Sequence, residues 1–573
     1  MPPTGKARFL RPTAVTYSAG DDGPTSVLKH ERLSAICPQA VPDWLCKKAA
    51  TMYTGSGIPQ VHQRNRLDCQ YVMHQQMLDP RQTEDCLFLD VFVPRSVFEK
   101  EACNRTQAAL APVVVSLGAT PFVFGSKNFI NLNEVSPAIL TSQSSHPDPC
   151  GTDFPISVSI NYRLGMFGWL TDEAGSANAG LWDQRLAMDW VKAHIENFGG
   201  DPNRITLVGS GGGAASIMHH VTAFGGQTNP EPPPYNLQGT TPFTSAIAVG
   251  PNWDFLPFFK RSSDSDSDSK YERNRDATQK AILKIMKVII GKGLYTIDEL
   301  RDLDSSVLMK VNRNLVRAAP MDMLVFGPVV GGDFTPKHPG LLLRDGHFND
   351  SLQLMVGHTI WDTLINAPFL NFGQRFGQHD ELNKRLTSIL NGYSNTTLDL
   401  VETEIYDDEA REELVDWFHP PPNFLGTQTP QEVVSGISMM EEILVGCNTR
   451  NLARGLPDST YSFDAGYAPL QGMIGLFRDK QDTSEGSGSG AGGPFDFRQR
   501  FLQFISGTTP IIAADDIGTV PWPVYGDDGI VVEASMGDKW GAVVTDDVFD
   551  NGRCDWWTGE GYEILEEESK DAE

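Results

Sequence analysis

The sequence has few cysteines, no long apolar run and no excess of basic residues, and each absence excludes a class of protein. Eight cysteines in 573 residues are too few for a fold built on disulfides. None of them forms a CxxC pair, so we expect no metal centre, and no motif calls for a cofactor. No stretch reaches the roughly 18 to 20 apolar residues of a membrane span. The net charge of −27 repels phosphate backbones, which argues against a nucleic-acid partner.

The composition is that of a globular protein, with 40% hydrophobic and 21% charged residues. Residues 87–94 alternate apolar and polar side chains, which predicts a strand. The β-branched runs at 111–117 and 155–165 are typical of strands buried on both faces of a parallel sheet. The stretch 181–202 predicts a helix with "GGDP" (199–202) as its C-terminal stop, followed by a strand at 204–210. The predicted apolar stripe of this helix comprises Leu181, Leu186, Met188, Trp190, Val191 and Ile195.

Two stretches have the composition of flexible surface loops. Residues 261–270 alternate serine with aspartate, and residues 485–493 consist mainly of glycine and serine. The alternation of strands and helices elsewhere indicates a doubly wound α/β sheet, whose sites lie at the carboxyl ends of the strands.

Several stretches together resemble the type-B carboxylesterase and cholinesterase family of α/β-hydrolases. They are "TEDCLFLDVFVP" (83–94), "NYRLGMFGWL" (161–170), the block from 178 to 209 and "GRCDWW" (552–557). They occur in family order along nearly the whole chain, so the resemblance implies one domain over 1–573. The implied fold is a large, mostly parallel sheet flanked by helices. The family's first strands are missing before "PPTGKARFLRP" (2–12), which indicates a lost hairpin or a start placed too late.

The resemblance also implies three structural pairs. Cys37 pairs with Cys86, Cys447 pairs with Cys554, and Arg8 forms a buried ion pair with Glu84. The chain carries no secretory signal, whereas the paired cysteines and three sequons fit a secreted protein. We therefore expect secretion if the start is truncated and a cytoplasmic location otherwise.

The family's catalytic serine lies in a GxSxG turn between a strand and a helix. The matching residues here run from Gly209 to Gly213, so Gly211 occupies the nucleophile position. Ser210 lies one residue early, where its side chain is expected to turn away from the site. The oxyanion loop corresponds to residues 118–122, with Gly212 as a further donor. The residues at the donor positions of this loop are Ala119, Thr120 and Pro121. Proline has no N–H to donate.

The other two members of the triad also have weak counterparts. Asp362 falls at the position of the family's acid, although an aspartate there is equally typical of a helix cap. Gly475 falls at the position of the base, and no histidine follows His419. Phe122 and His358 are candidate pocket residues, together with Ser210. His219 and His220 lie too far along the helix to replace the base and are interpreted as packing residues.

Loss of serine or histidine from such a triad removes about a factor of 10⁶ in rate. The sequence therefore predicts a carboxylesterase-like protein that does not hydrolyse esters. On the first interpretation, the protein is a pseudoenzyme that binds a small molecule or a protein partner through the former active-site gorge. The alternative is a repurposed enzyme of secondary metabolism that catalyses a cyclisation, elimination or rearrangement. A lesser alternative is an active hydrolase with a displaced nucleophile. Either a monomer or a homodimer is compatible with the family.

Overall fold

The protein is described here from a computed structural model of the 573-residue chain. The residues that the structure describes are 4–14, 35–45, 79–94, 97, 110–118, 122–127, 155–170, 177–226, 241–252, 297–319, 325–330, 332–359, 390, 394–418, 431–465, 497–514, 518–536 and 540–564. The two serine- and glycine-rich stretches at 261–270 and 485–493 lie outside these residues.

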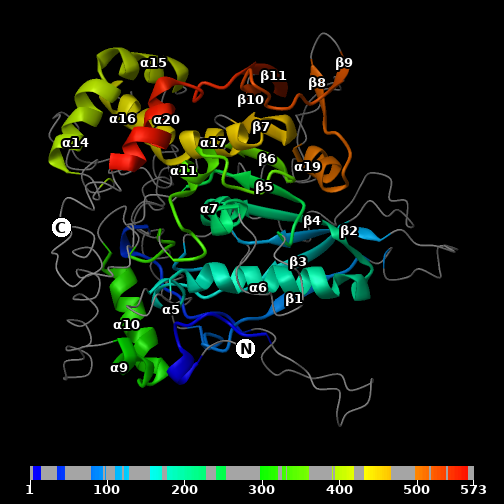
Figure 1. Ribbon diagram of the computed structural model, residues 1–573, viewed down its shortest axis with the longest axis vertical. Helices are drawn as coiled ribbons and strands as arrows, with labels where there is room; N and C mark the ends of the chain where they lie inside the picture. The colour runs from blue at the N-terminus through cyan, green and yellow to red at the C-terminus, as the bar shows by residue number, and fades with distance from the viewer. Residues whose placement is uncertain are drawn as a thin grey trace, which may run out of the picture.

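A nine-stranded, mostly parallel sheet forms the centre of the described part, in the order β1-β3-β2-β4-β5-β6-β7-β10-β11 (Figure 1). Only β1 with β3 and β10 with β11 pair antiparallel within it. The strands are β1 (Leu89–Phe92), β2 (Ala111–Ser116), β3 (Ile156–Ile160), β4 (Gly200–Ser210), β5 (Ser245–Val249), β6 (Gln353–His358), β7 (Thr460–Asp464), β10 (Ile530–Met536) and β11 (Trp540–Asp546). A separate hairpin pairs β8 (Ile511–Ala514) with β9 (Gly518–Pro521).

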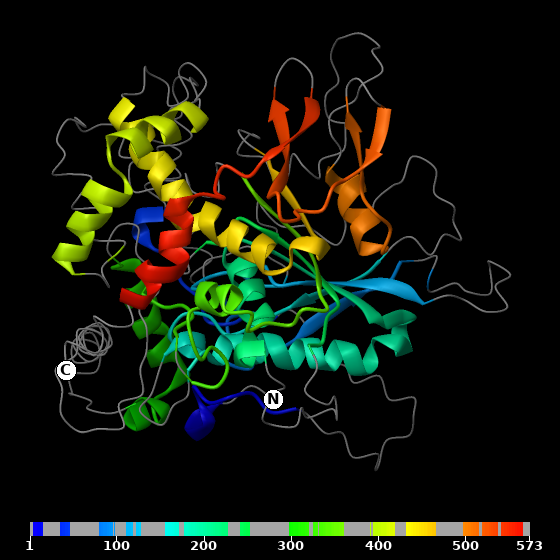
Figure 2. The same ribbon diagram turned by 45° about the horizontal axis from the view of Figure 1, so that its top comes forward.

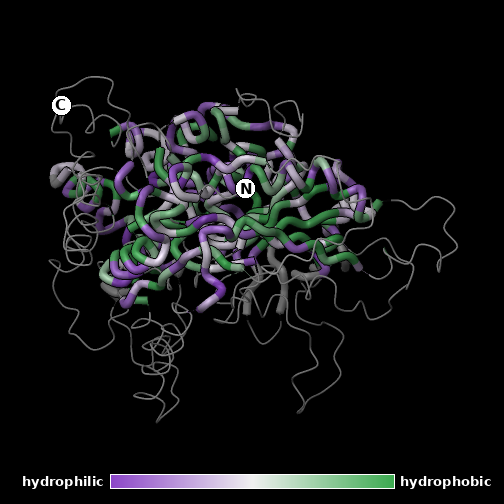
Figure 3. Tube along the Cα trace, turned by 90° about the horizontal axis from the view of Figure 1, so that it is seen from below, coloured by the Kyte–Doolittle hydropathy of each residue, from purple (hydrophilic) through white to green (hydrophobic). Residues whose placement is uncertain are grey.

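The predicted strand runs at 87–94, 111–117 and 155–165 correspond to β1, β2 and β3. Side chains of a strand alternate between the two faces of a sheet, so an unbroken apolar run fits a strand that is covered on both sides. In β2, Val113 and Val115 belong to one core cluster, whereas Val114 belongs to the cluster on the opposite face. The apolar strands run through the interior of the molecule (Figure 3).

Helices cover both faces of the sheet (Figures 1 and 2). Apolar residues of α6, α7 and α17 pack on one face, and α19 packs on the other. The helices are α5 (Met166–Trp169), α6 (Ala179–His194), α7 (Gly212–Val221), α9 (Ile297–Arg301), α10 (Ser305–Arg317), α11 (Pro339–Arg344), α14 (Asn395–Leu400), α15 (Asp408–Phe418), α16 (Gln431–Glu441), α17 (Cys447–Gly455), α19 (Phe497–Ile505) and α20 (Gly552–Trp556). Among the described residues, no helix is both long and apolar enough to cross a membrane.

Helix α6 ends close to its predicted stop but is more buried than its predicted stripe. It begins at Ala179 and ends at His194, and a 3-10 turn then runs to Phe198. Gly199 stops this turn with a positive φ of 85°, at the predicted "GGDP" stop, and β4 begins at Gly200. The helix is also buried beyond its predicted stripe. Its charged Asp183 is buried and pairs at 2.7 Å with Arg163, because α6 lies between the sheet and the loop that follows β3.

A second group of helices lies at one end of the sheet. Helices α14, α15 and α16 gather there with the C-terminal α20 in both views (Figures 1 and 2). Their apolar residues form a cluster of their own, which includes Tyr406 and Trp557. The predicted disulfide between Cys447 and Cys554 is confirmed, and it joins α17 to α20.

Both structural pairs near the N-terminus are confirmed as well. Cys37 and Cys86 form a disulfide. The guanidinium of Arg8 contacts both carboxylate oxygens of Glu84, at 2.6 and 2.8 Å, and both side chains are at least 94% buried. The same guanidinium donates to the backbone carbonyls of Arg301 and Leu303, so Arg8 ties the first described segment to α9 and the start of α10.

Candidate functional site

The turn between β4 and α7 has the geometry of a nucleophile elbow. The strand ends at Ser210, the helix begins at Gly212, and Gly211 lies between them with φ 53° and ψ −119°. This backbone conformation is unfavourable for any residue with a Cβ. The Gly211 N–H donates to the carbonyl of Val249 at 3.0 Å, and its carbonyl accepts from Ala215 at 2.9 Å. The turn is therefore fixed on both sides of Gly211.

The outer glycines of the turn are required by packing. A Cβ on Gly213 would lie 1.9 Å from the carbonyl oxygen of Gly118, and a Cβ on Gly209 would lie 2.5 Å from the carbonyl carbon of Gly213. Gly118 begins the segment that corresponds to the oxyanion loop. The elbow and the start of that segment are thus in direct backbone contact.

The remaining described residues of the predicted site lie in the interior. Ser210 is 3% exposed and pairs in register with Val249 of β5. Its neighbours Val208 and Val249 belong to the core cluster on the face opposite to α7, and strand alternation directs Ser210 to that same face. Phe122 is fully buried against Trp169, with ring centroids 4.8 Å apart, so it is a core residue. Ala119, Thr120, Pro121, Asp362 and Gly475 lie outside the described residues.

A buried polar chain supports the first turns of α7. Ser216 Oγ donates to the carbonyl of Gly212 at 2.9 Å, and Gln184 Nε2 donates to Ser216 Oγ at 3.1 Å. Nε2 of His220 in turn donates to Gln184 Oε1 at 2.9 Å. Burial lowers the pKa of His219 to about 3, and burial together with the Arg185 charge holds the pKa of His220 well below its ordinary value. Both imidazoles are neutral at pH 7 and act in packing.

The structure brings together two residues at the carboxyl ends of β6 and β7. His358 is the last residue of β6, and Asp464 is the last residue of β7 and lies opposite it in the parallel register. Nε2 of His358 lies 3.8 Å from Oδ1 of Asp464. His358 was predicted as a pocket residue, whereas Asp464 was not. The sequence signal that could have identified Asp464 is its place at the end of a predicted strand, because the carboxyl ends of parallel strands meet at one edge of the sheet.

Backbone hydrogen bonds relate this pair to the elbow. Gly211 bonds to Val249 of β5, Gly250 bonds to Gly357 of β6 at 2.7 Å, and Ala465 bonds to His358 at 2.9 Å. The elbow and His358 therefore lie at the same edge of the sheet, two strands apart, which corresponds to roughly 10 Å. Among the described residues, no group of three or more His, Cys, Asp or Glu is placed to hold a metal ion.

Asp547, which follows β11, is a further ionisable group on this side of the molecule. Burial raises its pKa to about 6, against the opposing effect of hydrogen bonds from the Phe549 N–H and the Tyr525 hydroxyl, both at 2.9 Å. The charge of His358 also acts on it. Burial and the Asp547 charge raise the pKa of Tyr525, so the phenol stays protonated and remains a donor.

We predict that Asp547→Asn becomes progressively more stable relative to the native protein as the pH rises from about 4 to 7. Between the ordinary pKa of 3.8 and the folded value of about 6, the folded state binds more protons than the unfolded state. The native protein therefore loses stability as the pH rises through this range. The change amounts to at most about 3 kcal/mol, and to less because Asp547 keeps some contact with solvent.

The measurement is urea unfolding of both proteins at a series of pH values. Asp546→Asn is the matched control, because Asp546 is the exposed neighbour of Asp547. Its profile is expected to run parallel to that of the native protein. A stability difference between Asp547→Asn and the native protein that does not change with pH would contradict the prediction.

Comparison with known proteins identifies the scaffold that carries this site. The model of the carboxylesterase family matches residues 1–228. Carboxylesterase patB of Penicillium expansum is 27% identical over 575 aligned residues, which cover 97% of this chain and 90% of that protein. The chain is similar to the carboxylesterase family, and the family match itself spans residues 1–228. The resemblance inferred from the sequence motifs is thereby confirmed.

Other relatives align with a smaller share of this chain. Carboxylesterase patB of Aspergillus clavatus is 32% identical over 64% of this chain, and Lipase 1 of Geotrichum candidum is 33% identical over 61%. These alignments span only 60% and 55% of the two relatives. Among solved structures, this chain is similar to a PNB esterase. The alignment covers 99% of this chain and 94% of the esterase chain, with a TM-score of 0.53 and 20% identity. The predicted α/β-hydrolase fold is confirmed.

Proposed function

We propose that this carboxylesterase-family protein does not hydrolyse esters through an acyl-enzyme and that it binds a small molecule or a protein partner at the former active site. The observation that carries the proposal is Gly211. It has the elbow conformation, with φ 53° and ψ −119°, but it has no side chain to acylate. Gly475 at the position of the base and Pro121 in the oxyanion loop support the same conclusion from the sequence.

The proposal accounts for a turn that is kept without its nucleophile. The outer glycines hold the elbow against the Gly118 carbonyl, so the scaffold depends on this turn for packing. A serine at 211 would have to adopt a strained backbone conformation. The resulting loss of folding stability is retained only where catalysis uses the serine. Glycine at 211 keeps the turn and relieves the strain.

The test is intact-mass spectrometry of the purified protein before and after incubation with a reactive fluorophosphonate. We expect no adduct, whereas an active serine hydrolase treated in parallel is labelled stoichiometrically. A single adduct mapped by digestion would overturn the proposal. If it mapped to Ser210, the protein would be a hydrolase with a displaced nucleophile.

Gly211→Ser is expected to destabilise the protein and to restore no esterase activity. The cost is about 1–3 kcal/mol, because serine must adopt a sparsely populated backbone conformation. Activity stays absent because the base position holds Gly475. Thermal unfolding and hydrolysis of a short nitrophenyl ester are the measurements.

Gly507→Ser is the matched control for this substitution. Gly507 also has a positive φ, of 75°, and a Cβ there would meet no atom within 4 Å. We expect it to cost less than Gly211→Ser, because it lies in an open turn away from the elbow. Esterase turnover by Gly211→Ser that a fluorophosphonate abolishes would contradict this account.

The second candidate function is a non-hydrolytic enzyme. The similarity to two proteins named carboxylesterase patB, one of which aligns over 97% of this chain, supports an enzymatic function, and the missing side chain at Gly211 argues against hydrolysis. Such an enzyme would catalyse a cyclisation, elimination or rearrangement. Mass spectrometry of the small molecules released on denaturation separates the two candidates. A bound molecule that is recovered unchanged after prolonged incubation supports binding, and conversion to a product of new mass supports catalysis.

A further inference from the structure

The residues Asn349, Asp350 and Ser351 form an acceptor motif for N-linked glycosylation on an exposed turn. Such a motif requires asparagine, then any residue except proline, and then serine or threonine. The turn lies between α11 and β6. Asp350 and Ser351 are exposed and Asn349 is partly exposed, so the folded protein can carry a bulky group here.

Hydrogen bonds hold the Asn349 side chain in one orientation. Its Oδ1 accepts from the Ser351 N–H at 3.0 Å and from the Ser351 hydroxyl at 2.6 Å. Its Nδ2 donates to Oγ1 of Thr241 at 2.6 Å, and this is its one hydrogen bond within the described part of the chain. The side-chain amide nitrogen of asparagine carries two hydrogens. A bond to a sugar can therefore replace one of them while the other still donates to Thr241.

The backbone of this turn is fixed as well. The Asn349 N–H donates to the carbonyl of Val221, the last residue of α7, at 3.3 Å. A Cβ on Gly226 would lie 2.5 Å from the backbone nitrogen of Phe348, so the turn packs closely against the segment that follows α7. A group attached to Asn349 therefore leaves the protein from a defined place on its surface.

The turn lies at the edge of the sheet opposite to the elbow. Thr241 precedes β5 and Asn349 precedes β6, whereas Gly211 and His358 lie at the carboxyl ends of the strands. Strand β6 has six residues, so the two edges are roughly 20 Å apart. A glycan on Asn349 therefore leaves the candidate functional site uncovered.

The two disulfides indicate the compartment in which this motif is used. Cys37 is bonded to Cys86, and Cys447 is bonded to Cys554. Structural disulfides form and persist in oxidising compartments such as the lumen of the endoplasmic reticulum. N-linked glycans occur on surface loops of proteins that follow this secretory route.

The other two motifs of this kind differ from the one at Asn349. Asn104 lies outside the described residues. In the motif that begins at Asn395, Thr397 is buried and its hydroxyl lies 3.0 Å from the Ser394 hydroxyl. The structure therefore favours Asn349 as the acceptor.

We propose that the protein passes through the secretory pathway and carries an N-linked glycan on Asn349. In this reaction Nδ2 forms a bond to the anomeric carbon of an oligosaccharide donated by a polyisoprenyl diphosphate. The bond from that carbon to the diphosphate oxygen breaks, the diphosphate leaves with the electron pair, and Nδ2 loses one proton. Nothing is oxidised or reduced. The inference does not depend on the proposed function, because it concerns the opposite edge of the sheet.

The experiment treats the full-length protein, isolated from the cells that naturally produce it, with peptide-N-glycosidase in isotopically labelled water. This enzyme removes the glycan and converts the asparagine that carried it to labelled aspartate, so peptide mass spectrometry identifies the occupied position. We expect the label at position 349. Recovery of unlabelled Asn349 would overturn the proposal, even if Asn104 or Asn395 were labelled.

Three variants produced in the same cells test the requirement for the motif. Ser351→Ala is expected to abolish the label at position 349, because it removes the hydroxyl that the motif requires, and Ser351→Thr is expected to keep it. Thr241→Ala is the matched control, since it removes the hydrogen bond to Nδ2 and leaves the motif intact. A label that persists in Ser351→Ala would arise from another reaction and would overturn the proposal. Fluorophosphonate labelling is unaffected by any of these outcomes, so the two proposals fail separately.

Discussion

Replacing both Cys447 and Cys554 by serine is expected to lower the free energy of unfolding by about 4 to 5 kcal/mol. The disulfide joins residues 107 apart in the sequence, and closing a loop of this length restricts the unfolded chain. The effect is expected to arise mainly in the unfolded state, since the two helices stay connected by other contacts in the folded state.

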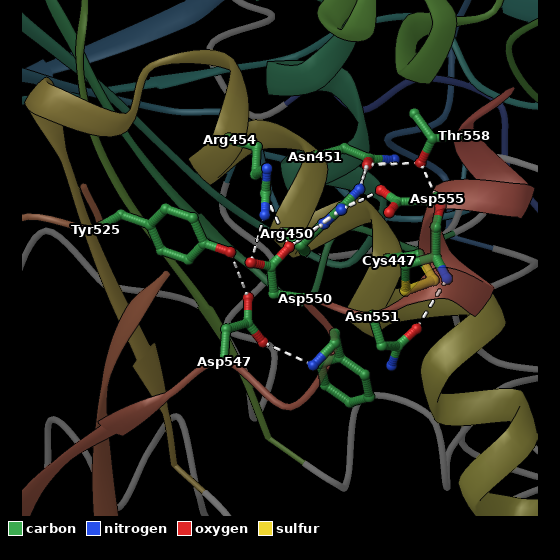
Figure 4. Close-up of polar contacts among 12 residues, drawn as sticks. Cys447, Arg450, Asn451, Arg454, Tyr525, Asp547, Asp550, Asn551, Asp555 and Thr558 are labelled. Carbon is green, nitrogen blue, oxygen red and sulfur yellow. Dashed lines mark hydrogen bonds and ion pairs between the residues drawn. A yellow bond between two sulfur atoms is a disulfide. The ribbon is translucent and has the colours of Figure 1, made fainter. Parts of the chain in front are cut away.

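Those contacts form a polar network around the disulfide (Figure 4). Arg450 contacts Asp550 at 3.1 Å, Thr558 donates to Asn451 at 2.7 Å, and Asn551 accepts from the Cys554 N–H at 3.0 Å. The variant is therefore expected to keep the native fluorescence of its tryptophans while its urea midpoint falls.

The control for this prediction is the Cys37→Ser/Cys86→Ser variant. This disulfide joins residues only 49 apart, so the same relation between loop length and chain entropy gives a smaller loss in the free energy of unfolding, about 4 kcal/mol. A Cys447→Ser/Cys554→Ser protein that unfolds at the native urea midpoint would show that the bridge does not constrain the unfolded chain.

Arg8→Met is expected to cost about 3–5 kcal/mol, since it leaves the buried Glu84 carboxylate without its counter-ion. Both side chains are at least 94% buried, so water cannot replace the lost contacts at 2.6 and 2.8 Å. The carbonyls of Arg301 and Leu303 lose their donor in the same substitution. Urea unfolding at pH 7 measures the loss.

Arg344→Met is the surface control. Arg344 contacts Glu563 at 2.8 Å, but the two side chains are 37% and 53% exposed, so the expected cost is at most about 1 kcal/mol. Adding Glu84→Leu to Arg8→Met removes both buried charges and is expected to recover part of the loss. Equal effects of Arg8→Met and Arg344→Met would refute the assignment of a buried ion pair.

The elbow at Gly211 concerns acyl transfer, which requires a nucleophile at the end of β4. Fluorophosphonate labelling tests this requirement directly, because it reports only a reactive side chain.

The sequence alone determined the family, the central strands and the missing side chain at the elbow. Unbroken β-branched runs are readable because a strand buried on both faces tolerates few polar residues. Both disulfides and the Arg8–Glu84 pair also followed from the resemblance. The stop of α6 followed from "GGDP" (199–202), whereas the burial of Asp183 did not, because an apolar stripe does not show which charged residues a neighbouring loop covers.

Only the tertiary structure decided which distant residues share a site. Asp464 meets His358 through the register of β6 with β7, and the long crossovers between parallel strands leave no local sequence signal for that register. The same reason applies to the contact between Gly213 and Gly118, which depends on how β2 and β4 lie side by side. The positive-φ backbone conformation at Gly211 is likewise a property of the folded turn, because glycine permits many conformations and the sequence cannot show which one it adopts.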